Sequence, residues 1–174
     1  MNEEISISRV EVVQNRVVLH LSQDRGLPEN PGVLFEVSEK YASSLVPHPD
    51  LMDAVARFRI HLMRAVFRED YMQMDSKSIL NNFLREVERL KVKKVEQKGS
   101  NEILGISIEC SQKTFDGGVN IIKTGKMRLN QTSSYPFWEE LEEDWRNLKE
   151  EAELFFMGAK HSTEVELTLS SLFD

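Results

Sequence analysis

The sequence predicts an α+β protein in which an antiparallel sheet has two to three helices packed on one face. Segments with alternating apolar and polar residues, typical of half-buried strands, lie near the N-terminus and again between residues 91 and 129. Helix-like patterns separate these two groups of strands, and a further long one follows them. This order of strands, helices, strands and helix favours an antiparallel sheet with segregated helices over a parallel α/β sheet. The length of 174 residues and the 40% hydrophobic content fit one domain over residues 1–174.

The first strands are predicted from β-branched residues and turn signals. Residues 5–13 and 16–21 are rich in valine and isoleucine, and Gln14-Asn15 between them predicts a hairpin with a two-residue turn. Residues 22–32 contain two prolines and two glycines, which predicts a mobile loop. Alternation over residues 33–37 predicts a third strand.

Two helices and two further strands are expected next. Pro49 and Asp50 suit a helix start, and the apolar residues from Leu51 to Ala65 recur at steps of three and four. A second helix is expected after a cap at Ser76 or Ser78. Strand-like patterns follow at 91–97, 104–110 and 119–129, with the turn signal Asp116-Gly117-Gly118 before the last of them. Gly125 inside that last strand suggests a bulge or a close backbone approach.

The stretch from Ser134 to Lys160 predicts the helix around which the core forms. Ser134 is the expected N-cap, and Gly158 is the expected stop. Six apolar residues at helical spacing, including both tryptophans of the chain, are expected to face inward: Trp138, Leu141, Trp145, Leu148, Ala152 and Phe155. Alternation at 165–169 suggests a short edge strand after it.

Composition narrows the class of protein. The net charge of −7 argues for a soluble protein and against wholesale binding to nucleic acid or to an anionic membrane surface. The single cysteine, Cys110, excludes an intramolecular disulfide and a cysteine-based zinc site, which fits a reducing compartment. The N-terminus has no signal-peptide pattern, and no apolar run reaches about 18 residues. A cytoplasmic location and no membrane partner are therefore expected.

No catalytic or metal-binding motif stands out in the sequence. The four histidines are scattered, and neither His48 nor His61, at or within a predicted helix, has a second histidine or a carboxylate at the spacing of helical metal sites. The phosphate-binding and nucleophile motifs rich in glycine are missing from the sequence. We therefore expect no catalytic residues, no metal and no cofactor, although an enzyme site that only the fold assembles stays open as an alternative.

Charge is segregated along the chain. Residues 57–98 contain eleven Lys or Arg and six Asp or Glu, whereas residues 139–153 contain two and eight. One explanation is that two helices of opposite charge lie side by side and compensate each other. The alternative is an anion site for a nucleic-acid backbone or a nucleotide phosphate on one helix side, formed by Arg57, His61, Arg64 and Arg68.

The C-terminus offers a candidate for docking to a partner. Leu169, Leu172 and Phe173 lie in an otherwise polar segment, and residues 170–174 are expected to form a flexible tail unless something holds them. The last residues resemble the short motif by which bacterial DNA-processing proteins dock on the replication sliding clamp. Ser171 and the Leu-Phe pair match that motif, whereas Leu169 stands where the motif has glutamine. Packing of Leu172 and Phe173 against the protein's own sheet is the other interpretation.

At family level the chain resembles small proteins of unknown activity that bacteriophages and prophages encode. The resemblance is carried by short segments from residue 48 onward: His48-Pro49-Asp50-Leu51, the strands with Gly105 and Gly125, Leu129-Asn130 with Thr132, Glu151-Ala152 leading into Gly158-Ala159-Lys160, and Leu172-Phe173. It implies a phage or mobile-element origin and no particular activity. We therefore expect a non-catalytic accessory protein that binds a host or phage protein and can form a homo-oligomer. Binding of a nucleic acid or nucleotide is the alternative.

Overall fold

The sheet that organises the molecule is antiparallel throughout, as the sequence predicts. The computed structural model describes residues 5–27, 29–99 and 103–162. The strands run in the order β3-β2-β1-β5-β6-β7, and β8 pairs with β6 beyond the end of β7. The bounds are β1 Ile5–Val13, β2 Arg16–Leu27, β3 Asn30–Ala42, β5 Leu90–Lys98, β6 Gly105–Lys113, β7 Val119–Lys123 and β8 Met127–Arg128. A separate pair joins β4 Val46–Pro47 to β9 His161–Ser162.

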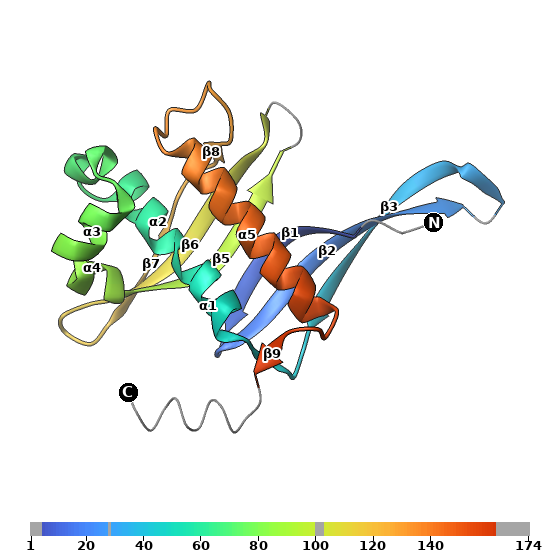
Figure 1. Ribbon diagram of the computed structural model, residues 1–174, viewed down its shortest axis with the longest axis horizontal. Helices are drawn as coiled ribbons and strands as arrows, with labels where there is room; N and C mark the ends of the chain where they lie inside the picture. The colour runs from blue at the N-terminus through green and yellow to red at the C-terminus, as the bar shows by residue number, and fades with distance from the viewer. Residues whose placement is uncertain (1–4, 28, 100–102, 163–174) are drawn as a thin grey trace.

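The helices cover one face of this sheet, which confirms the predicted α+β class (Figure 1). α1 packs on β5, and α2 packs on β5 and β6. α5 packs on β1 and on both of these helices, while α3 and α4 lie at one end of the molecule. The bounds are α1 Pro49–Ala56, α2 Phe58–Val66, the 3₁₀ turn η1 Glu69–Gln73, α3 Ser76–Asn82, α4 Leu84–Glu88 and α5 Trp138–Phe156. None of the helices in the described residues has the length and apolar character that crossing a bilayer requires.

The first hairpin forms where the sequence predicts it, but the prediction of a loop over residues 22–32 is wrong. Gln14 and Asn15 have φ angles of 50° and 61°, as a tight turn between twisted strands requires. Over residues 22–32, where a mobile loop is expected, β2 continues to Leu27 and β3 begins at Asn30. After Gln23, which pairs with Ile5, the described part of β2 pairs with β3 alone. This two-stranded section, residues 24–36, extends away from the helices (Figure 1) and is called the arm below.

Helix α5 carries the core, with two differences from the expectation. Its inward face buries Leu141, Trp145, Leu148, Ala152 and Phe155. Trp138 is only half-buried, because it occupies the first turn at the edge of the sheet. The helix begins at Trp138 and not near Ser134, since residues 133–137 form turns in which the Ser133 hydroxyl accepts a hydrogen bond from the backbone N–H of Tyr135. Gly158, at a φ of 70°, follows the C-terminal end as predicted.

The other helices begin at caps that polar side chains supply. His48 Nδ1 accepts from the backbone N–H of Asp50 at the start of α1. Asp75, and not Ser76 or Ser78, caps α3 by accepting from the Ser78 backbone N–H at 2.7 Å, which lowers the pKa of Asp75. The long helix expected after Pro49 is interrupted at Arg57, so it is divided into α1 and α2.

The strand expected over residues 119–129 is divided as well. It breaks between β7 and β8 around Gly125, where an added Cβ would meet nothing within 4 Å, so no close backbone approach occurs there. The close approach is at Gly105, where a Cβ would lie 2.7 Å from the carbonyl oxygen of Met127 in β8. Gly105 is therefore the glycine that this strand pairing requires.

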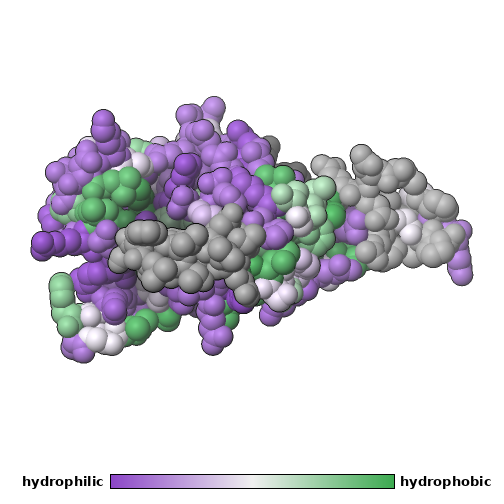
Figure 2. Space-filling view, turned by 60° about the horizontal axis from the view of Figure 1, so that its bottom comes forward, coloured by the Kyte–Doolittle hydropathy of each residue, from purple (hydrophilic) through white to green (hydrophobic). Residues whose placement is uncertain are grey.

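The face of the sheet opposite the helices carries paired charges and also exposes Val13, Val119 and Ile121. A chain of ion pairs crosses it from β7 to β1: Lys123–Glu109, Glu109–Lys94, Lys94–Glu96, Glu96–Arg9 and Arg9–Glu11. Burial is the largest single influence on the pKa of Glu96 and would raise it, but the hydrogen bond from Arg9 at 2.7 Å and the positive charges of Arg9, Lys98 and Lys94 together lower that pKa. In the view of Figure 2 the surface is mainly hydrophilic, and a hydrophobic patch lies at the end formed by α3 and α4, where Leu80 and Leu84 are exposed.

Candidate functional site

The four residues of the predicted anion site do not form one exposed stripe. The side chains of Arg57 and Arg68 are 60% and 66% exposed, whereas His61 and Arg64 are buried. Arg68 pairs with Asp70 just after it in the chain. The two buried members face α5, Arg57 reaches α5 from the exposed margin of this contact, and Arg68 lies outside it. The helix period alone places the four residues on one side, but it does not show what covers that side.

The acidic helix α5 covers this side, so the charge segregation is compensated within the molecule. Asp144 Oδ2 lies 2.7 Å from His61 Nε2, and Asp144 Oδ1 lies 3.8 Å from the guanidinium of Arg57. Glu140, one turn earlier on α5, lies 3.5 Å from Arg64 Nη1. These pairs are the side-by-side arrangement of oppositely charged helices that the sequence suggests.

Tyr135 completes this buried group, and nothing in the sequence indicated it. Its hydroxyl oxygen lies 2.6 Å from His61 Nδ1 and accepts from Arg64 Nη1 at 3.3 Å. Because the Asp144 carboxylate can only accept, His61 Nε2 donates to it, and in the neutral imidazole Nδ1 accepts from the tyrosine O–H. Burial raises the pKa of Tyr135 to about 12, although the hydrogen bond from Arg64 acts in the opposite direction. We call His61, Arg64, Tyr135, Glu140 and Asp144 the polar cluster.

Arg64 has a partner at every nitrogen. Nε donates to the carbonyl oxygen of Met74 at 3.1 Å, and Nη2 donates to the Ser76 hydroxyl at 3.1 Å, which in turn donates to Glu140. The guanidinium carbon also lies 3.6 Å from the centre of the Phe137 ring. An external phosphate would have to displace several of these contacts to reach Arg64, so the geometry favours a structural role for this residue.

The polar cluster also contains the one group of potential metal ligands found among the described residues. Ligand atoms of His61, Glu140 and Asp144 all lie within 4.8 Å of one another. The sequence did not predict this group, because the histidine comes from α2 and the two carboxylates, at positions i and i+4, come from α5. Both carboxylates already have a guanidinium partner, and His61 Nε2 is engaged with Asp144. These interactions compensate the negative charge that would attract a cation, so we assign no metal to the group.

A different feature, beside the start of α5, is open to solvent. A hollow of about 540 Å³ lies between the first turn of α5, β8 and the loop that follows β8. We call it the Trp138 groove, and it is lined by Ile103, Arg128, Leu129, Asn130, Gln131, Thr132 and Trp138. Ile103 is 53% exposed, and Trp138 is half-buried at the opposite wall. The groove therefore combines apolar walls with one cation and several amide or hydroxyl groups.

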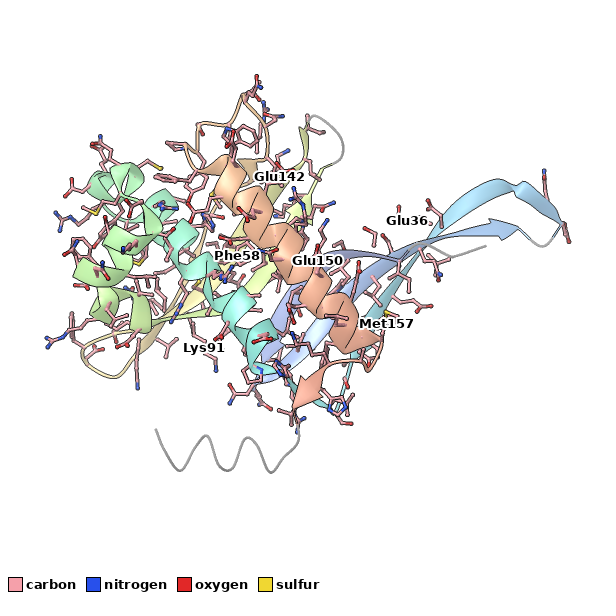
Figure 3. All side chains as sticks on the ribbon, in the orientation of Figure 1. Glu36, Phe58, Lys91, Glu142, Glu150 and Met157 are labelled. Carbon is pink, nitrogen blue, oxygen red and sulfur yellow. The ribbon has the colours of Figure 1, made fainter. Side chains whose placement is uncertain are left out.

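A smaller hollow of about 130 Å³ continues the Trp138 groove along α5 and shares Leu129 with it. It is lined on the helix side by Glu142, Trp145, Arg146 and Lys149, and Figure 3 labels Glu142 on this half of the helix. The indole N–H of Trp145 donates to Gln97 at 2.9 Å, and Lys149 lies 5.8 Å from the centre of the Trp145 ring. Arg128, Arg146 and Lys149 thus border a continuous surface that both tryptophans reach.

The sequence signal for this groove was the pair of tryptophans, which the helical period assigned to the core. For Trp145 that assignment is correct, and for Trp138 it is wrong. The predicted docking residues Leu169, Leu172 and Phe173, and the short strand expected at 165–169, lie outside the described residues.

Comparison with known proteins adds no functional assignment. The chain matches no protein-family model, no curated protein and no solved structure. Any function must therefore be argued from the geometry of the chain itself.

Proposed function

We propose that this chain is an accessory protein of phage or mobile-element type that binds a host or phage protein and carries out no catalysis of its own. The phage origin depends on the sequence resemblance alone. The observation that carries the binding proposal is the Trp138 groove, in which a half-buried indole, an exposed isoleucine and an arginine surround an open hollow.

The chemistry of the groove suits a protein segment. Tryptophan and arginine are the residues most enriched where protein interfaces gain their affinity, especially around pockets that exclude water. Ile103, Leu129 and Trp138 offer apolar contact for one large side chain of a partner. Arg128 and Lys149 favour a partner with acidic residues next to that side chain, whereas Arg146 is already paired with Glu142 in the same hollow.

The burial of the polar cluster argues against a catalytic role for its histidine, arginine and tyrosine. A general acid or base must reach its substrate within hydrogen-bond distance or through one water. His61, Arg64 and Tyr135 are 0%, 1% and 3% exposed, and none of them lines the Trp138 groove or its continuation. Their hydrogen bonds join α2, α3 and α5 to the segment before α5, which is a structural role.

The experiment identifies the partner by proximity and then measures its affinity. A photo-crosslinking amino acid at Gln131, in the wall of the groove, is expected to capture one protein in phage-carrying cells. The purified partner is then titrated against wild type, Trp138→Ala and Arg128→Glu. Each variant is expected to bind at least tenfold more weakly while its melting temperature stays near that of wild type. Phe115→Ala, which removes a 94% exposed aromatic ring that lines neither the groove nor its continuation, is the matched control and should bind like wild type.

Two outcomes would redirect the proposal. Unchanged affinity in both groove variants would show that the groove is not the binding site. If a chain truncated before Leu169 then fails to bind, the docking site is in the C-terminal tail. Binding of a labelled oligonucleotide that Arg128→Glu abolishes, with no protein captured, would instead favour the nucleic-acid alternative.

A further inference from the structure

The two edges of the sheet differ in length and in what they expose. At one edge lie β7, with five residues, and the two-residue β8. At the other edge lies β3, with 13 residues, which pairs within the described part of the chain with β2 only. Each residue other than proline along such an edge has a backbone N–H and C=O, and about half of these groups point away from the sheet, where another strand can pair with them.

Glu36 and Lys40 give this edge a defined charge pattern. The register pairs Lys40 with His20 and Glu36 with Asp24, so both side chains project from the same face of β3 as Ser38. This is the face opposite the helices, because Tyr41, next to Lys40, contacts Phe156 of α5 on the helix side. Glu36, Ser38 and Lys40 are all exposed, and Figure 3 shows Glu36 on the arm, beyond the end of α5 marked by Met157.

We propose that β3 pairs with β3 of a second copy of this chain, antiparallel and around a twofold axis through Ser38, so that one continuous sheet spans the dimer. Residue i of one copy then lies opposite residue 76 − i of the other, which places Glu36 opposite Lys40 of the second copy, twice. Opposite charges at directly facing positions stabilise a strand pair, and like charges destabilise it. The edge is therefore complementary to itself in this register, as a twofold interface requires.

Neighbouring registers lack this complementarity. Directly facing residues of an antiparallel pair point to the same face of the sheet, whereas neighbours along one strand point to opposite faces. If the helices of both copies lie on the same face of the joint sheet, the twofold axis must therefore pass between the two copies of one residue, so that this residue faces itself. An axis through Glu36, Glu39 or Lys40 places each of these charges opposite its own copy. An axis through Val37 places Glu36 opposite Ser38 and forms no ion pair from it. The charge pattern thus selects a second copy and one register, whereas an unrelated strand would gain nothing from this symmetry.

The helices leave room for this pairing. The C-terminal end of α5 lies over Tyr41, where the Tyr41 and Phe156 rings are 4.8 Å apart. In the proposed register the two Tyr41 residues are six positions apart along the joined strands, which is about 20 Å at about 3.4 Å per residue. The two α5 ends therefore stay apart, and each arm extends alongside the second copy. β3 and the Trp138 groove are at opposite edges of the strand order, so this inference is independent of the proposed function.

The test reverses the charges one at a time and then together. By sedimentation velocity over a dilution series, wild type is expected to be a dimer, and Glu36→Lys and Lys40→Glu are each expected to weaken the dimer at least tenfold. The double variant, which restores opposite charges at the facing positions, is expected to dimerise like wild type. Circular dichroism checks that each variant is folded. A monomeric wild type, single variants that dimerise normally, or a double variant that does not recover would overturn the proposal.

A crosslink tests the position of the axis. Ser38→Cys places two thiols opposite each other at the axis, so mild oxidation or a short bismaleimide should yield a covalent dimer. Cys110, the native thiol, is buried and does not compete. Asn120→Cys, an exposed position on β7 at the other edge, is the matched control and should remain uncrosslinked. Equal crosslinking at both positions would show random collision and contradict the assigned register.

Discussion

The interface between α2 and α5 and the arm formed by β2 and β3 differ in how their polar groups are satisfied. In the polar cluster the histidine, arginine and tyrosine are almost fully buried, and each finds its partners within the protein. In the arm, two strands extend beyond the body and expose Asp24, Glu29 and Glu36. The arm also presents the backbone of β3 as an open edge.

This difference separates residues that hold the fold from residues that are available for contact. A buried charged group costs free energy unless it is paired, so the polar cluster is expected to be sensitive to any single truncation. A two-stranded ribbon has little stability of its own, and it persists here as an extension of a larger sheet. Changes in the arm should therefore affect association much more than folding.

The largest effect is expected from Asp144→Ala. This change removes the acceptor for His61 Nε2, which is buried, and one charge partner of Arg57. A buried donor that loses its charged acceptor typically costs about 1 to 3 kcal/mol of the free energy of unfolding, and the upper end is expected here. Asp144→Asn keeps an acceptor oxygen and should cost less. Urea denaturation of both variants measures the difference. A cost below about 1 kcal/mol for Asp144→Ala would show that Asp144 contributes no more to stability than a residue in an exposed ion pair does.

A smaller effect is expected at alkaline pH. Tyr135 has a pKa of about 12 in the folded protein and an ordinary value of 10.0. Between these values the unfolded chain loses this proton and the folded chain keeps it, so the free energy of unfolding falls as pH rises from 10 to 12. Two pH units correspond to about 2 to 3 kcal/mol. Cys110, whose pKa burial raises from 9.0 to about 12, contributes in the same direction.

The measurement compares slopes and not absolute stabilities, because Tyr135→Phe also removes the hydrogen bond to His61. Urea unfolding at several pH values from 9 upward should show a flatter decline for Tyr135→Phe than for wild type. Parallel declines would mean that Tyr135 ionises as readily in the folded protein as in the unfolded chain.

The contrast between the two regions also explains what the sequence could predict. The hairpin turn at Gln14-Asn15, the inward face of α5 and the α+β class follow from local signals, namely turn chemistry and periodicity. Compensation between oppositely charged helices was one of two interpretations that charge segregation allowed. The polar cluster could not be predicted from the sequence, because His61, Tyr135 and Asp144 come from three separate segments that only the tertiary fold brings together.

The arm was missed for a different physical reason. Proline and glycine usually mark loops, and residues 22–32 contain two of each. Here β3 is an edge strand, where proline is tolerated because no neighbour requires its missing N–H. Gly26 pairs with Leu34 and Leu27 pairs with Asn30, so the register shifts here and residues 31–33 have no directly facing residue in β2. Pro31 and Gly32 are two of these three residues. Because Leu27 pairs with Asn30, pairing between the consecutive strands β2 and β3 continues through most of the stretch that the local signals assign to a loop.

The smallest effect on folding is expected from shortening the arm. Gln23 and Val37 face each other in the register, so replacing residues 24–36 with Asn-Gly joins β2 and β3 by a two-residue turn. The helices and the core of the sheet lie outside this section (Figure 1), so the monomer should lose no more than about 0.5 kcal/mol. Urea denaturation at protein concentrations where both chains are monomeric measures this change in the free energy of unfolding without a contribution from dimerisation. The same change removes Glu36, and the shortened chain should therefore lose any dependence of its melting temperature on protein concentration. A shortened chain that unfolds at much lower urea would show that the arm supports the core, and the separation between the two regions would then be wrong.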